Sequence, residues 1–145
     1  MLNVPAVQTV ILEARSCAMA MQESGTYIRS ELPNVRMAAD LVAQAKSLCD
    51  DLIGTSFDVI PELLELDDLL AYGGSEEDIE SAIELFMRWL SDDIRKMGEL
   101  VMKLRAAAEH DPECEGSYIL VAECALNVLE PFNRARAAAD SIRRT

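Results

Sequence analysis

Residues 75–110 read SEEDIESAIELFMRWLSDDIRKMGELVMKLRAAAEH, and this stretch decides the fold class. Its apolar residues recur at spacings of three and four, the period of one α-helix face. Ser75 and Asp78 resemble a capping box, with Asp in place of Glu. The run before Pro112 predicts a helix about 50 Å long at 1.5 Å per residue. Its apolar face consists of Ile79, Ile83, Phe86, Leu90, Ile94, Met97, Val101, Leu104 and Ala108.

The same helical period appears on both sides of this stretch, and no segment alternates with the period of two that strands show. Glycine and proline divide the flanking sequence into further predicted helices. We therefore expect the 145 residues to form a single all-α domain, a helical bundle of four long helices plus one short helix. The flanking helices are predicted from about Val4 to Ser24 and a closing Gly25, from Asn34 to Ile53, from Asp58 to about Leu70, and from Ser117 onward with a kink near Asn127 caused by Pro131.

The predicted helix lengths are unequal, because the first two helices span about 30 Å each. The helix of residues 75–110 then extends beyond its neighbours and needs a cover. A homodimer through this fourth helix is the simplest cover. Its expected contacts are Trp89, Ile94, Met97 and Val101.

The formal net charge of −13 restricts the partners that the chain can attract. An acidic surface repels nucleic acid and anionic membranes and favours a basic protein surface. We expect no direct nucleic-acid binding and no membrane association. The apolar run near the N-terminus is interrupted by Glu13 and Arg15, too soon for a signal peptide or a membrane span, so a cytoplasmic location is expected. The four cysteines have no C-x-x-C spacing, which favours buried free thiols in a reducing compartment.

The acidic residues are concentrated in one part of the chain. Residues 56–85 contain ten carboxylates and no Lys or Arg. Such a block can clamp a basic protein surface. Glu76 and Glu77 also have a structural explanation, since acids in a first helical turn interact favourably with the helix dipole. The candidate partner-binding residues are Asp58, Glu62, Glu65, Asp67, Asp68, Glu76 and Glu77.

Catalytic and metal-binding patterns are weak. Di-iron bundles use Glu-x-x-His motifs, and the only histidine, His110, has no Glu three residues before it. A zinc site from His110, Cys114 and Cys124 matches no finger spacing. No Gly-rich loop or nucleophile motif accompanies this single histidine. No metal and no cofactor are therefore expected.

Arg105 and His110 form an Arg-x4-His arrangement on a predicted helix. This arrangement resembles the motif of HEPN-domain ribonucleases, in which Arg and His act on the RNA phosphodiester. The resemblance covers these two residues, and it implies that Arg105 and His110 are catalytic. The family usually has a polar residue after the Arg, where this chain has Ala106.

The leading hypothesis is a small acidic, non-enzymatic protein that binds a partner and regulates or inhibits it. Immunity proteins, antitoxins and phage inhibitors fit this size and charge by analogy of class. A HEPN-like ribonuclease is the first alternative. A helical subunit of an oligomeric structure is the second.

Overall fold

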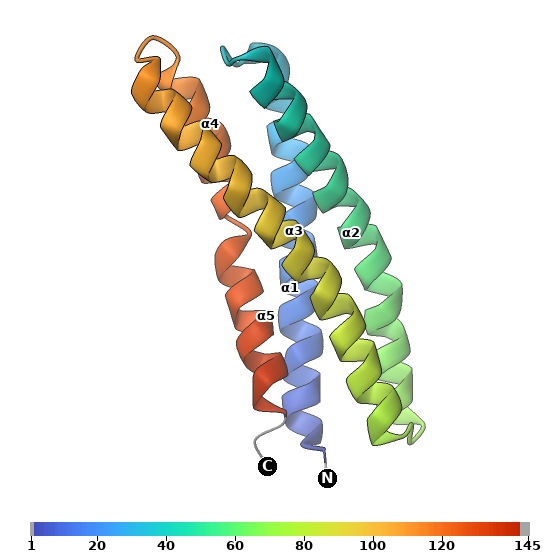
Figure 1. Cartoon of the computed structure of the whole chain (residues 1–145). Helices are drawn as coiled ribbons and strands as arrows, with labels where there is room; N and C mark the ends of the chain where they lie inside the picture. Colours follow the sequence, from blue (N-terminus) through green and yellow to red (C-terminus); the bar gives the residue numbers. More distant parts are fainter. Residues whose placement is uncertain (1, 143–145) are drawn as a thin grey trace.

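The structure is a computed structural model that describes residues 2–142, and it contains helices and no strand in that range. Four antiparallel rods form a bundle (Figure 1). The first three rods are single helices, and two shorter helices in succession form the fourth. The helices are α1 (Val4–Glu31), the 3₁₀ turn η1 (Leu32–Asn34), α2 (Ala39–Ala71), α3 (Glu76–His110), α4 (Glu115–Leu126) and α5 (Leu129–Ser141).

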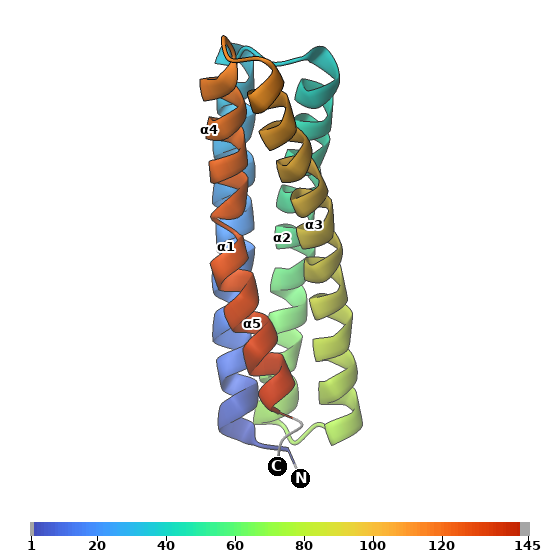
Figure 2. The same ribbon diagram turned by 60° about the vertical axis from the view of Figure 1, so that its left-hand side comes forward.

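The rods follow each other up and down around the bundle, as Figures 1 and 2 show from two sides. Neighbouring pairs are α1 with α2, α2 with α3, α3 with α4, and α1 with α5. The α2–α3 turn lies at the same end of the bundle as the start of α1 and the end of α5. The all-α helical bundle expected from the sequence is confirmed.

Helix α3 agrees closely with the prediction for residues 75–110. The Ser75 hydroxyl accepts a hydrogen bond from the backbone N–H of Asp78 at 3.1 Å, and the helix ends at His110. Eight of the nine apolar positions are buried. Ile94, the ninth, is half-buried and packs against the core.

Helix α1 does not end at Gly25, as the glycine signal predicted, but continues to Glu31. Gly25 is buried where α1 approaches α2. A Cβ atom at Gly25 would lie 2.9 Å from Cγ1 of Ile53 and 3.2 Å from the carbonyl oxygen of Cys49. Glycine is therefore needed here for close helix packing rather than for a helix end.

The prediction of two helices between Asn34 and Leu70 is also wrong, because α2 is one helix of 33 residues. Asn34 lies in η1, and the N-cap of α2 is Ala38. Gly54 and Pro61 are both inside α2 and face solvent. Buried residues continue with the same period through both positions, so tertiary packing overrides these local signals. They are Leu48, Cys49, Leu52, Ser56, Val59, Leu63 and Leu66.

The fourth rod is interrupted at the position that Pro131 predicted. Helix α4 ends at Leu126 and α5 begins at Leu129. Pro131 has no N–H for the carbonyl of Asn127, which accounts for the break. Ser117 does not cap α4, since the N-cap is Cys114. The Ser117 hydroxyl instead accepts a hydrogen bond from the backbone N–H of Arg36 at 2.9 Å.

The unequal lengths that suggested a dimer do not occur. The 33 residues of α2 accompany the 35 of α3 along the bundle. Met97 and Val101 are buried within the chain, so they are core residues and not contacts on a free surface. Trp89 and Ile94 are half-buried and pack against the same core. The homodimer stays a prediction, but a difference in helix length no longer supports it.

Candidate protein-binding surface

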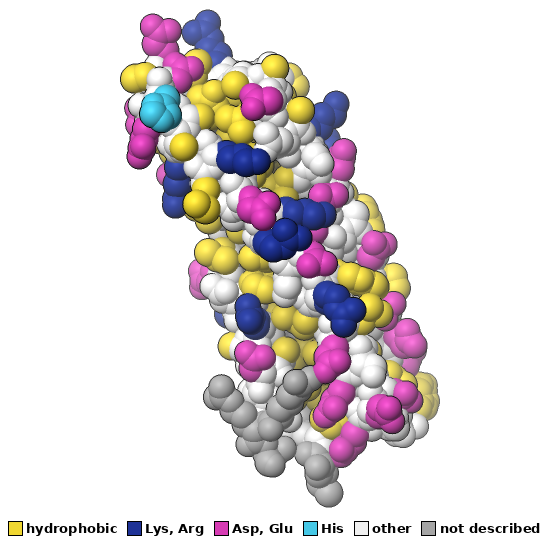
Figure 3. Space-filling view, viewed as in Figure 1, with side chains coloured by type: hydrophobic (Ala, Val, Ile, Leu, Met, Phe, Trp, Pro, Cys, Tyr) yellow, Lys and Arg dark blue, Asp and Glu magenta, His cyan; other side chains and the backbone are white. Residues whose placement is uncertain are grey.

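The seven predicted partner-binding residues lie on the second half of α2 and in the first turn of α3, and we call this surface the acidic end. Six of them are exposed, and Glu62 is half-buried. In Figure 3 acidic side chains gather over this end of the face, whereas basic side chains lie along its middle and opposite end. The residues of the acidic end are Asp58, Glu62, Glu65, Asp67, Asp68, Glu76 and Glu77.

Two residues of the acidic end have partners within the chain. Asp67 lies 4.0 Å from the guanidinium of Arg15, and Glu76 accepts a hydrogen bond from the backbone N–H of Leu2 at 2.8 Å. The first contact joins α1 to α2, and the second joins the segment before α1 to the first turn of α3. For the part of the chain that the structure describes, no ion pair joins the other five to a basic side chain. These five are Asp58, Glu62, Glu65, Asp68 and Glu77.

The structure brings some of these carboxylates together and separates others. Asp58, Glu62 and Glu65 follow the i, i+4, i+7 spacing and share one side of α2. Asp67 is on the side of α2 that meets α1, as its contact with Arg15 shows. Glu76 and Glu77 are in the first turn of α3. The acidic end thus extends over the last four turns of α2 and the first turn of α3 rather than forming one flat face.

Large apolar side chains are exposed on α2 beside these acids, and sequence reasoning missed them. Phe57 is 62% exposed, Ile60 37% and Leu64 56%, and we call these three the apolar stripe. Leu63, Leu66 and Leu69 also follow a helical spacing beside these acids, but Leu63 and Leu66 are buried and Leu69 is half-buried. The 57, 60, 64 spacing is the signal that could have identified the correct set.

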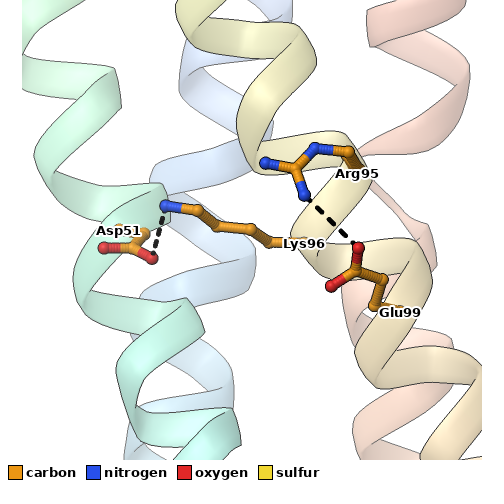
Figure 4. Close-up of polar contacts among 4 residues, drawn as sticks. All are labelled: Asp51, Arg95, Lys96 and Glu99. Atoms are coloured by element: carbon orange, nitrogen blue, oxygen red, sulfur yellow. Dashed lines mark hydrogen bonds and ion pairs between the residues drawn. The ribbon is translucent and has the colours of Figure 1, made fainter.

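Basic residues in the middle of the bundle are paired within the chain, in contrast to the acids of the acidic end. The Lys96 ammonium lies 3.2 Å from a carboxylate oxygen of Asp51 and links α3 to α2 (Figure 4). Arg95 pairs with Glu99 one turn later on α3 at 3.3 Å (Figure 4). The charge excess at the acidic end is therefore not offset by these neighbours.

One carboxylate is buried in the core. Asp93 of α3 is 4% exposed, and its Oδ2 atom has no hydrogen-bond partner among the described residues. Burial raises the pKa of the Asp93 carboxyl to about 6, while a hydrogen bond from Thr55 and the charge of Lys96 act in the opposite direction. Burial, with the nearby Asp93, raises the pKa of the Cys17 thiol to about 12. A thiol with such a pKa is a poor nucleophile.

The remaining cysteines and the histidine belong to no metal-binding group in the described residues. All four thiols are free, Cys17 and Cys49 are buried, and Cys114 and Cys124 are half-buried. Burial raises the pKa of Cys49 to about 11. No group of three His, Cys, Asp or Glu side chains within residues 2–142 is arranged to hold a metal ion.

Arg105 and His110 are both exposed near the end of α3, but they project from different sides. Five residues of an α-helix turn through about 140° beyond one full turn. Arg105 lines a hollow of about 350 Å³ whose other charged residues are Glu109, Glu115 and Glu123. Three carboxylates around one arginine oppose the binding of an RNA phosphate.

Comparisons of the chain with protein-family models, with curated proteins and with solved structures found no match in any of the three. In residues 2–142, no helix has both the length and the apolar character that crossing a membrane requires.

Proposed function

We propose that this protein is a non-enzymatic binding protein, which regulates or inhibits a partner by holding a basic surface of that partner at the acidic end. The observation that carries the proposal is the group of five carboxylates without a basic partner in the described chain. Clustered charges of one sign raise the potential around them and attract the opposite sign.

The geometry supports binding better than catalysis. Six of the seven acids are exposed on the second half of α2 and the first turn of α3, so a partner surface can reach them. The apolar stripe on the same part of α2 adds apolar surface that is removed from water when a partner binds. Charges at such a surface mainly accelerate association and exclude acidic competitors, and apolar contacts slow dissociation.

A capture experiment with two charge-reversed proteins tests this proposal. The first carries Glu62→Lys, Glu65→Lys and Asp68→Lys in the acidic end. The matched control carries Glu109→Lys, Glu113→Lys and Glu115→Lys at the opposite end of the bundle. All six residues lie at the surface, so both variants are expected to fold.

Wild type and control should retain the same basic protein from a lysate of the native host, identified by mass spectrometry. The acidic-end variant should retain at least about tenfold less of it, a difference of about 1.4 kcal/mol. Capture should weaken between about 0.05 M and about 0.3 M salt, because exposed charges are screened over about 10 Å at 0.1 M. Equal retention by all three proteins would refute the proposal.

A further inference from the structure

The apolar stripe is unusual because it accompanies a complete core face on the same helix. The residues one position before them, Ser56, Val59 and Leu63, are buried. Phe57 and Leu64 leave more than half of their surface exposed, at 62% and 56%, and Ile60 leaves 37% exposed. Exposed apolar residues gathered at helical spacing are typical of a docking face.

The stripe lies on the exposed flank of α2 that borders α1. Contacts of Arg29 with Asp50 and of Arg15 with Asp67 set the antiparallel register of the two helices. This register places Met19 of α1, which is 53% exposed, level with the turn that contains Ile60 and Leu64. Met19 adds apolar surface beside the stripe, and it also lines a hollow of about 540 Å³ on α1.

A backbone acceptor is present within the stripe. Pro61 is inside α2 and has no N–H, so the carbonyl of Phe57 lacks the i+4 donor that it would otherwise have. Such an oxygen can accept a hydrogen bond from a partner side chain. Lys and Arg have several donors each.

Charges decide which partner fits this face. Asp68 follows Leu64 by one turn on the same side of α2, and Asp58 and Glu65 adjoin Phe57 and Leu64 in sequence. Two copies, each with a net charge of −13, would repel each other. The border of the stripe away from α1 is therefore acidic and favours Lys and Arg. On the α1 side, Arg15 and Arg29 are already paired with Asp67 and Asp50.

We infer that the apolar stripe is the docking face for an amphipathic helix of the partner, with its apolar side on Phe57, Ile60 and Leu64 and with Lys or Arg along its margins. This inference rests on the proposed function and names the structural class of the partner segment. Helix-in-groove recognition uses anchors at i, i+3, i+4 and i+7. The stripe extends seven residues along α2, about 10 Å, so two to three turns of a partner helix would cover it.

A pair of synthetic peptides tests the inference. One peptide, about 18 residues long, has Leu at helical i, i+3, i+4, i+7 positions and Lys elsewhere. The other has the same composition in an order without a helical stripe. Fluorescence anisotropy gives the Kd of each for wild type, for Phe57→Ser with Leu64→Ser, and for a control with Met102→Ser and Ile119→Ser. Met102 and Ile119 are 73% and 38% exposed and lie toward the other end of the bundle.

Wild type and control should bind the amphipathic peptide at least about tenfold more tightly than the scrambled one. The Phe57→Ser, Leu64→Ser variant should bind both peptides as weakly as wild type binds the scrambled one. The Lys variant of Glu62, Glu65 and Asp68 should bind both peptides more weakly than wild type does, because both carry the same charge.

The outcomes separate the inference from the proposed function. Equal, salt-sensitive binding of both peptides by wild type would overturn the docking face and leave the acidic end as a binding surface. Binding of neither peptide would overturn both. A further outcome is that sedimentation shows wild type as a dimer and the Phe57→Ser, Leu64→Ser variant as a monomer. That result would assign the stripe to a second copy and would also overturn the inference.

Discussion

The hydroxyl of Tyr118 accepts a hydrogen bond from the backbone N–H of Ala38 at 2.9 Å, although the two residues are 80 positions apart. Ala38 is the N-cap of α2 and has no side chain that could cap the helix. The bond satisfies the N–H that a capping-box Glu or Gln would otherwise satisfy. It joins the loop before α2 to the first turns of α4.

Replacing Tyr118 by Phe should therefore destabilise the bundle by about 1 kcal/mol or more, because a half-buried N–H loses its acceptor. Urea unfolding followed by circular dichroism measures this loss. Tyr27→Phe is the control, since Tyr27 is 48% exposed and has no such bond among the described contacts. Equal stability of both variants would mean that water replaces the Tyr118 hydroxyl without cost.

Asp93→Asn should stabilise the protein in a manner that depends on pH. The Asp93 pKa is about 6 in the folded chain and about 3.9 when unfolded, so the folded state holds this proton more tightly. Ionisation of Asp93 therefore opposes folding. The cost is absent below about pH 4, develops between pH 4 and pH 6, and is complete above it.

Two pKa units correspond to about 3 kcal/mol, so Asp93→Asn should gain up to that amount at pH 8 and almost nothing at pH 4. Urea unfolding at several pH values gives the difference. Asp92→Asn changes an exposed neighbour and should shift stability by less than about 0.5 kcal/mol. A gain that is the same at pH 8 and pH 4 would show that charge is not its cause.

Gly25→Leu should destabilise the protein by about 1–3 kcal/mol or more, because the added side chain meets Ile53 and the carbonyl of Cys49. Gly98→Ala provides the opposite case. A Cβ at Gly98 meets nothing within 4 Å, so alanine should raise stability by up to about 1 kcal/mol through its helix propensity. Thermal unfolding compares the two. A stable Gly25→Leu protein would contradict the close approach of α1 and α2.

Pro61→Ala should stabilise α2, because alanine restores a donor for the carbonyl of Phe57. Proline in a helix interior costs about 3 kcal/mol, and the exposed position of Pro61 leaves the rest of the packing unchanged. A gain of about 1–3 kcal/mol in urea unfolding is expected. An unchanged or lower stability would indicate that α2 is already bent to accommodate the proline.

The sequence predicted α3 well because Ile79 to Ala108 keep one helical period and Ser75 supplies its cap. It also predicted the break before Pro131, since a missing N–H acts locally. Gly25, Gly54 and Pro61 misled the prediction of α1 and α2. Local propensities of about 1–3 kcal/mol were overridden there by packing that only the assembled bundle provides.

The candidate surface was likewise predictable only in part. The carboxylates of residues 56–85 are visible as composition, and charged side chains are rarely buried, so their exposure followed from residue type. Leu63 and Leu64 have the same side chain and adjoin each other, yet Leu63 is buried and Leu64 is exposed. The orientation of α2 against α1 and α3 decides between them. A pattern with two adjacent apolar stripes does not reveal that orientation.

The up-and-down order of the rods also determines when each contact forms during folding. Each hairpin joins neighbours in sequence, and contacts between near neighbours form fast. The hydrogen bonds from Arg36 to Ser117 and from Ala38 to Tyr118 span 81 and 80 residues, so they require most of the chain to be in place. Breaking such late contacts accelerates unfolding and leaves the folding rate almost unchanged. The contact of Arg134 with Glu13 spans 121 residues and belongs to the same class. The contacts that close the fourth rod against the other rods therefore govern how long the native state persists.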